Sequence, residues 1–192
     1  MFDVFGFYKF IKISYLKKNQ KILQDQLLNK NIRGTIIISN EGLNGTISGK
    51  NKDIKLIKDY LHKLFKFEKF DSINNSKSSF QPFHKPKVKI KKEVVPFNLS
   101  LKKRIKKKDS HVNPQKWNLL IKDKKTVLID ARKSFEYKVG TFKGSINPDV
   151  DNFRDFPKYL KKIKKNQPIA MFCTGGIRCE KASVYLENKG YN

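Results

Sequence analysis

The stretch that most constrains the fold runs from Ile169 to Ala182, with the sequence Ile-Ala-Met-Phe-Cys-Thr-Gly-Gly-Ile-Arg-Cys-Glu-Lys-Ala. It predicts a buried strand, a glycine-rich turn and the start of a helix, in that order. Cys173 ends the apolar run, and the two glycines that follow let backbone N–H groups curl toward its sulfur. A helix N-terminus and Arg178 add positive potential, so the pattern favours a thiolate over a thiol.

Packing offers an alternative role for this cysteine, because most free cysteines are small buried hydrophobic residues. A packing cysteine requires neither paired glycines nor an arginine five positions later, so we favour a reactive Cys173 whose anion is stabilised by Arg178. The loop backbone expected around its sulfur comprises Thr174, Gly175, Gly176 and Ile177.

Cys179 is a supporting candidate, because either cysteine could resolve an oxidised form of the other. The helix is expected to begin near Cys179, which directs this second side chain away from the centre of the loop. Cys173 is therefore the predicted nucleophile.

The segment Cys173–Arg178 resembles the active-site loop of rhodanese-domain proteins, which has the pattern C-x-x-G-x-R. Upstream, Val127–Arg132, Phe135–Gly140 and Phe142–Pro148 follow the rhodanese order of strand, D-x-R, E-Y-x-x-G and G-x-x-N. Tyrosine phosphatases place one more residue between their Cys and Arg than this chain does. The smaller loop suits a sulfur atom better than a phosphate.

Three further stretches narrow the resemblance to the rhodanese-domain tRNA uridine-34 hydroxylases (TrhO). These stretches are Ser39–Gly49, Gly140–Gly144 and Ile146–Asp149, and they act together with the longer loop segment Cys173–Lys181. The resemblance implies oxygen-dependent 5-hydroxylation of the wobble uridine, with the tRNA anticodon arm as partner and molecular oxygen as co-substrate. Cys173 would be the nucleophile or a persulfide carrier, and no flavin, iron or haem motif indicates how oxygen is activated. A persulfide sulfurtransferase and a non-catalytic RNA-binding protein are the two alternatives.

Two domains joined by a basic linker are expected. Residues 1–98 predict the β-α-β-β-α-β order of a ferredoxin-like α+β fold, with strands at 7–13, 34–39, 46–48 and 87–95. The segment 40–45 has turn chemistry, and the serine- and asparagine-rich segment 72–79 is expected to be a loop. Residues 99–111 are a lysine-rich linker.

Residues 112–192 predict the α/β rhodanese-like catalytic domain, expected to lack its last strand and helix. Asn113 and Pro114 predict a helix start, and Pro157 predicts another. Asp130 and Arg132 follow a predicted parallel strand, where functional groups gather in open α/β sheets. A structural ion pair with the loop of the neighbouring strand explains these charges at least as well, and the same two explanations apply to Glu136.

The formal net charge of +26 favours a polyanionic partner such as nucleic acid. Lysine outnumbers arginine 38 to 5, however, which A+T-rich coding also produces without any such partner. The predicted last strand of the first domain places Lys87, Lys89 and Lys91 on one face, a candidate RNA-binding ladder or simply a solvated strand.

Metal binding and membrane insertion find no support in the sequence. The three histidines lack ligand spacing, and the two cysteines form neither a zinc motif nor a disulfide framework, so we assign no metal. Asp3, Lys9 and Lys12 interrupt the apolar N-terminus, which is unlike a signal peptide. We therefore expect a cytoplasmic protein with reduced thiols.

Overall fold

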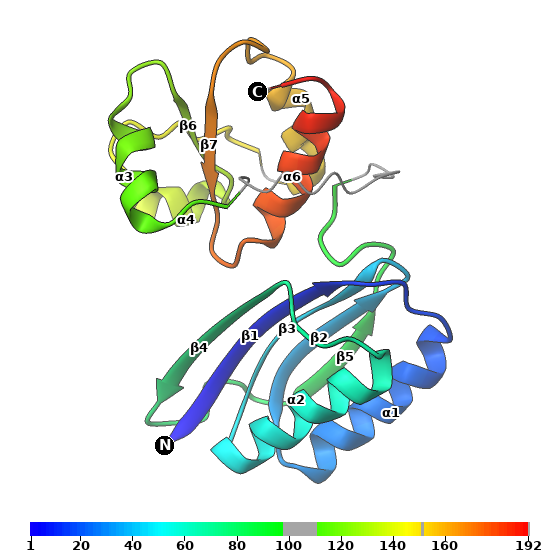
Figure 1. Cartoon of the computed structure of the whole chain (residues 1–192). Coiled ribbons are helices and arrows are strands. Elements are labelled where there is room, and N and C mark those ends of the chain that lie inside the picture. The colour runs from blue at the N-terminus through cyan, green and yellow to red at the C-terminus, as the bar shows by residue number, and fades with distance from the viewer. Residues whose placement is uncertain (98–110, 151, 192) are drawn as a thin grey trace. The chain divides into compact units, whose positions relative to one another are not determined.

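The computed structural model describes residues 1–97, 111–150 and 152–191, which form two compact units, Met1–Val95 and Pro96–Asn192. Each unit has its own sheet and its own hydrophobic core (Figure 1). Apart from His111, the expected linker lies outside the described residues. Independent folding of the two parts stays a prediction. Within the described ranges, no helix is both long and apolar enough to cross a membrane.

The first unit is a five-stranded sheet with strand order β4-β1-β3-β2-β5, and two helices cover one of its faces (Figure 1). All neighbouring strands are antiparallel except β2 and β5, which are parallel. This confirms the ferredoxin-like arrangement. Its elements are β1 (Phe2–Phe10), α1 (Leu16–Asn29), β2 (Arg33–Ser39), β3 (Gly42–Gly49), α2 (Asn51–Phe65), β4 (Ser72–Ser78) and β5 (Pro86–Ile90).

Strand β4 corrects the sequence prediction, which assigned the segment 72–79 to a loop. It pairs with β1 along Ser72–Ser78 and is the fourth strand of the ferredoxin-like order, so β5 is an additional fifth strand. Most β4 side chains are exposed, because this edge strand is held by backbone hydrogen bonds to β1. Without a buried face it carries no alternating apolar pattern for sequence analysis to detect.

The core of the first unit lies between the sheet and its two helices. Leu23 and Leu27 on α1 are fully buried, and Ile57 and Leu61 on α2 follow the same helical spacing. They pack with apolar side chains of the sheet, among them Phe5, Phe7, Ile36, Ile38 and Leu43. Helical spacing in α1 and α2 and alternation in the strands therefore account for this core.

The turn between β2 and β3 is tighter than expected, and β3 already begins at Gly42. Gly42 adopts φ +151°, and a Cβ there would lie 2.1 Å from the carbonyl oxygen of Lys9 on the paired β1. The Glu41 carboxylate accepts the backbone N–H of Val94 at 2.8 Å, which attaches the segment after β5 to this turn. Glu41 and Gly42 therefore have structural reasons for their positions.

Strand β5 lies at the sheet edge, with Val88 buried and Lys87 and Lys89 exposed. Its outer backbone groups bind glutamines of α1. Gln20 Nε2 donates to the Val88 carbonyl at 2.8 Å, and Gln24 Oε1 accepts the Val88 N–H at 2.9 Å. Because a helix satisfies this edge, protection from strand addition does not depend on the lysines alone. Lys91, just past the end of β5, is also exposed.

The second unit contains a parallel pair, β6 (Val127–Asp130) and β7 (Ile169–Phe172), with helices around it (Figure 1). These helices are α3 (Pro114–Lys122), α4 (Ser134–Val139), the 3-10 turn η1 (Phe153–Asp155), α5 (Phe156–Leu160) and α6 (Ile177–Asn188). Asn113 Oδ1 caps α3 by accepting the Lys116 N–H at 2.8 Å, and Pro157 lies in the first turn of α5, so both predicted helix starts are confirmed.

The core of the second unit includes Phe97, which is fully buried and contacts Phe153 and Tyr185. This core therefore begins upstream of the expected linker. Leu160 on α5 is fully buried in this core. No side chain of α3 is fully buried, and the half-buried Trp117 ring contacts Phe142 in the loop after α4 and Phe172 in β7.

Replacing Gly42 with alanine is expected to destabilise the first unit by about 2–4 kcal/mol, because its φ and the Lys9 carbonyl both exclude a Cβ. Gly6→Ala in β1 is the matched control, since a Cβ there meets its nearest atom at 3.5 Å. Urea unfolding of the purified chain measures both. Equal midpoints for the two variants would contradict this account of the turn.

Candidate functional site

Cys173 follows the last residue of β7 and precedes the loop that leads into α6. Gly176 adopts φ +85°, a left-handed conformation that favours glycine, and it is the N-cap of α6. Its backbone N–H donates to Cys173 Sγ at 3.1 Å. The predicted convergence of loop amides on this sulfur is therefore present at Gly176, and α6 begins at Ile177, earlier than expected.

Cys179 lies in the first turn of α6 and contacts Cys173, so the expectation that its side chain leaves the loop is wrong. Starting the helix at Ile177 turns the Cys179 thiol inward, where it donates to Cys173 Sγ. This hydrogen bond is the largest influence on Cys173. Burial opposes ionisation of Cys173, whereas the backbone N–H groups of Cys179 and Arg178 and the charge of Arg178 favour it, so that the pKa of Cys173 falls to about 5. The same bond, together with burial, raises the pKa of Cys179 well above its ordinary value.

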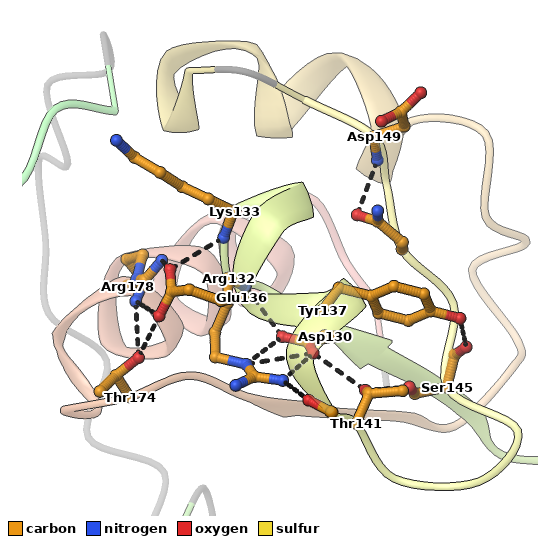
Figure 2. Close-up of polar contacts among 12 residues, drawn as sticks. Asp130, Arg132, Lys133, Glu136, Tyr137, Thr141, Ser145, Asp149, Thr174 and Arg178 are labelled. Carbon is orange, nitrogen blue, oxygen red and sulfur yellow. Dashed lines mark hydrogen bonds and ion pairs between the residues drawn. The ribbon is translucent and has the colours of Figure 1, made fainter.

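The side chain of Arg178 binds a carboxylate and not the cysteine. Its Nη1 donates to Glu136 Oε2 at 3.1 Å, and its Nη2 donates to Thr174 Oγ1 at 3.0 Å (Figure 2). Thr174 Oγ1 in turn donates to Glu136 Oε1 at 2.6 Å. Burial works against ionisation of Glu136, but the bonds from Arg178 and Thr174 lower its pKa to about 2. Sequence analysis left Glu136 undecided, and the structure makes it the partner of Arg178.

Asp130 and Arg132 form an ion pair at the end of β6. Arg132 donates through Nε to Asp130 Oδ1 at 2.9 Å and through Nη2 to Oδ2 at 2.6 Å (Figure 2). The fully buried Asp130 also accepts the Thr141 hydroxyl, and Arg132 Nη2 donates to the Gly140 carbonyl. Although burial favours the neutral acid, these bonds hold the pKa of Asp130 below its usual value. The two charges thus pair with each other and not with the loop of the neighbouring strand, and the pair holds the segment that contains Gly140 and Thr141. Their supporting role in catalysis stays a prediction.

An aromatic cluster lies beside the cysteine loop, and sequence analysis missed it. The rings of Phe142 and Phe172 meet edge to face at 4.9 Å, and Trp117 contacts both rings, at 5.5 and 5.9 Å. Phe172 directly precedes Cys173, whereas Trp117 comes from α3 and Phe142 from the loop after α4. The only sequence signal was the apolar character of these positions, which does not reveal that distant rings meet.

Two cavities open at Cys173. The first has a volume of about 340 Å³ and is lined by Arg132, Gly140, Thr141, Phe142, Phe172, Cys173 and Thr174. The second, of about 630 Å³, extends along β7 and α6 and includes Trp117, Phe142, Cys173 and Cys179 in its lining. Phe142, Phe172 and Cys173 line both. Within the described ranges, no three His, Cys, Asp or Glu side chains are grouped to hold a metal ion.

The lysine ladder lies in the first unit, and Lys87, Lys89 and Lys91 are all exposed. The site around Cys173 belongs entirely to the second unit. Their roles in RNA binding and catalysis stay predictions at this point.

Known protein families match both parts of the chain. Residues 2–94 match the UPF0176 acylphosphatase-like domain, and residues 113–192 match the rhodanese-like domain. Among solved structures, acylphosphatase from Bacillus subtilis is similar to 47% of this chain and to 100% of its own, at 11% identity and a TM-score of 0.35.

Curated relatives match the chain along its whole length. It is 68% identical over 191 residues to a protein of Pelagibacter ubique named tRNA uridine(34) hydroxylase, covering 100% of this chain and 63% of the relative. A protein of the same name from Bartonella henselae is 39% identical, covering 99% of this chain and 64% of the relative. The chain therefore spans somewhat less than two thirds of the relatives that it matches.

The hydrogen bond from Cys179 predicts a specific pH profile for alkylation of Cys173. In the wild-type chain the rate of iodoacetamide alkylation should rise with a midpoint near pH 5, the pKa of Cys173. Cys179→Ala removes the largest stabilising bond, so the midpoint should move upward, whereas Cys179→Ser keeps a donor and should move it less. Mass spectrometry of the Cys173 peptide measures each profile. Identical midpoints in all three proteins would exclude Cys179 as the donor.

Proposed function

We propose a function for this chain from one premise: it belongs to the family that joins a UPF0176 acylphosphatase-like domain to a rhodanese-like domain, whose curated members include tRNA uridine(34) hydroxylases. The proposed activity is hydroxylation of C5 of the wobble uridine in tRNA, with molecular oxygen as co-substrate. The proposed compartment is the cytoplasm, where thiols are kept reduced. No further cofactor is assigned.

The observation that carries this proposal is the stabilised thiolate of Cys173, a residue that lines two cavities. At neutral pH a thiol with a pKa of about 5 is almost entirely thiolate, the nucleophilic form. The bonds from Gly176 and Cys179 stabilise this anion, and Arg178 contributes its charge while it is bound to Glu136. Cys173 and Arg178 thus have the proposed catalytic roles, and Cys179 supports them.

The chemistry of uracil explains why a thiolate is useful. The C5–C6 double bond is conjugated with the C4 carbonyl, so C6 can accept a nucleophile. Addition of Cys173 Sγ to C6 breaks the C5–C6 π bond and places the electron pair on C5 and the C4 oxygen. C5 then becomes the electron-rich carbon of the adduct. When Cys173 Sγ leaves C6 with its bonding electron pair, the proton on C5 is lost and the C5–C6 double bond is restored. In this proposal the protein supplies the nucleophile and the groups that hold its charge.

Cys173→Ser should abolish 5-hydroxyuridine derivatives at the wobble position while leaving tRNA binding within about twofold of wild type, because the serine hydroxyl stays protonated at neutral pH. Cys179→Ser should be milder. Each variant is expressed in a strain deleted for the native activity, and tRNA nucleosides are measured by mass spectrometry.

The same measurement separates the alternatives. Wild-type complementation that restores thiolated nucleosides instead of 5-hydroxyuridine derivatives would identify a sulfurtransferase. Binding of tRNA with no change in any nucleoside would identify a non-catalytic RNA-binding protein. A fully active Cys173→Ser variant would overturn the assignment of the nucleophile.

The lysine ladder of the first unit is the proposed contact with the RNA backbone. Lys87 and Lys89 project from the exposed face of β5, and Lys91 follows at its end. The α1 glutamines already occupy the strand edge, which leaves the lysine charges available for phosphates. The proposed ligand is the anticodon arm of tRNA, whose phosphates attract such a ladder without reading sequence.

Changing all three ladder lysines to serine should weaken tRNA binding and lower the slope of log affinity against log salt by about two, since each lost phosphate contact contributes about 0.7 for a single strand. Fluorescence anisotropy over a salt series measures both quantities. The control changes the exposed α2 lysines Lys52, Lys55 and Lys63 to serine, which alters net charge equally. If both triple variants lost the same amount of tRNA affinity and salt slope, the effect would be one of overall charge, and a specific contact by the ladder would be excluded.

A further inference from the structure

Phe142 is an exposed aromatic ring held in a fixed place beside Cys173. Its side chain is 42% exposed, although its ring contacts both Phe172 and Trp117. The preceding residue, Thr141, donates to the buried Asp130, and Arg132 donates to the Gly140 carbonyl. These two hydrogen bonds, one to Asp130 and one from Arg132, therefore hold in place the two residues that precede Phe142. An exposed ring on so well-fixed a segment is suited to contact a ligand.

The smaller cavity at Cys173 combines an aromatic wall with polar groups. Phe142 and Phe172 supply its apolar lining, while Arg132, Thr141 and Thr174 supply polar groups. Its volume of about 340 Å³ lies within the range of small-ligand sites. Nη1 of Arg132 donates to no residue in the described part of the chain, so it can donate a hydrogen bond to a carbonyl oxygen of a ligand. This combination fits a planar ring with polar edges.

We propose that Phe142 stacks on the target uracil base and holds it in this cavity against Cys173 Sγ. The inference rests on the proposed function and names the residue that receives the base. Single-stranded RNA loops are commonly bound by stacking of unpaired bases on aromatic side chains, and an enzyme that acts on a base must first take it out of its stack. Phe172 and Trp117 are more buried and mainly support Phe142.

A binding experiment with the full chain tests this site. The probe is a fluorescently labelled anticodon stem-loop with uridine at the wobble position, compared with the same RNA carrying an abasic wobble site. Wild-type protein should bind the uridine RNA about tenfold more tightly, the contribution of one stacked base. Phe142→Leu keeps an apolar side chain against Trp117 but loses the ring, so this preference should nearly disappear. Phe142→Tyr should retain it.

The chain offers both a control and a local reporter. Phe135 on α4 is 63% exposed and lines neither cavity at Cys173, so Phe135→Leu should keep the wild-type preference. Trp117 is the only tryptophan, and its ring contacts Phe142. The uridine RNA should therefore quench its fluorescence more strongly than the abasic RNA. The assignment would be overturned if Phe142→Leu kept the wild-type preference for uridine RNA over abasic RNA, or if Phe142→Leu and Phe135→Leu lost this preference equally.

Modification kinetics separate this inference from the proposed function. If wild-type chain forms 5-hydroxyuridine, Phe142→Leu should raise KM about tenfold with a smaller effect on kcat, as expected for lost base binding. Wild-type kinetics in that variant would reject the stacking role and leave the hydroxylase proposal intact. If the wild-type protein hydroxylates no uridine but its preference for the uridine RNA still depends on Phe142, the hydroxylase proposal is rejected and the base-binding site is retained.

Discussion

The ion pair between Arg178 and Glu136 is the contact on which the cysteine loop depends. Arg178 stands in the first turn of α6 and Glu136 in α4, so the pair joins the two helices that flank the loop. Thr174 donates to the same carboxylate, which fixes the loop one residue after Cys173. With both ends of the loop held, the N–H of Gly176 stays within 3.1 Å of the sulfur. The geometry that stabilises the thiolate is thus maintained by the side chains of Arg178, Glu136 and Thr174, which bond to one another and not to the sulfur.

This arrangement assigns different tasks to the two arginines of the site. Arg178 bonds to Glu136, so it acts on Cys173 through its charge and its backbone N–H. Arg132 bonds to Asp130 and to the Gly140 carbonyl, and it positions the loop that carries Phe142. Because both guanidinium groups are already bound to carboxylates, neither adds a large uncompensated positive charge. The strongest stabilisation of the thiolate is therefore the short-range bond from Cys179.

Sequence analysis predicted the elements whose side chains alternate between a buried and an exposed face. The strand predicted at 34–39, observed as β2, belongs to this group. The helix start at Asn113 is also observed, and the reactivity of Cys173 stays a prediction that its lowered pKa supports. Strand β4 escaped prediction because backbone pairing alone holds it, and pairing leaves no pattern in side chains. The Cys179 contact and the Phe142 cluster also escaped. Both depend on where α6 begins and how distant segments meet, which local periodicity does not encode.

The low pKa of Cys173 is better suited to releasing a substrate than to attacking one. At pH 7, lowering the pKa of a thiol from about 9 to about 5 raises the thiolate fraction about a hundredfold. Intrinsic nucleophilicity falls with pKa with a Brønsted coefficient of about 0.45, which costs about sixtyfold over the same interval. The rate of attack is therefore nearly unchanged, whereas the sulfur becomes a better leaving group with every unit by which its pKa falls. In the proposed reaction the bond between Cys173 and the base must break again, and a sulfur with a low pKa is suited to that step.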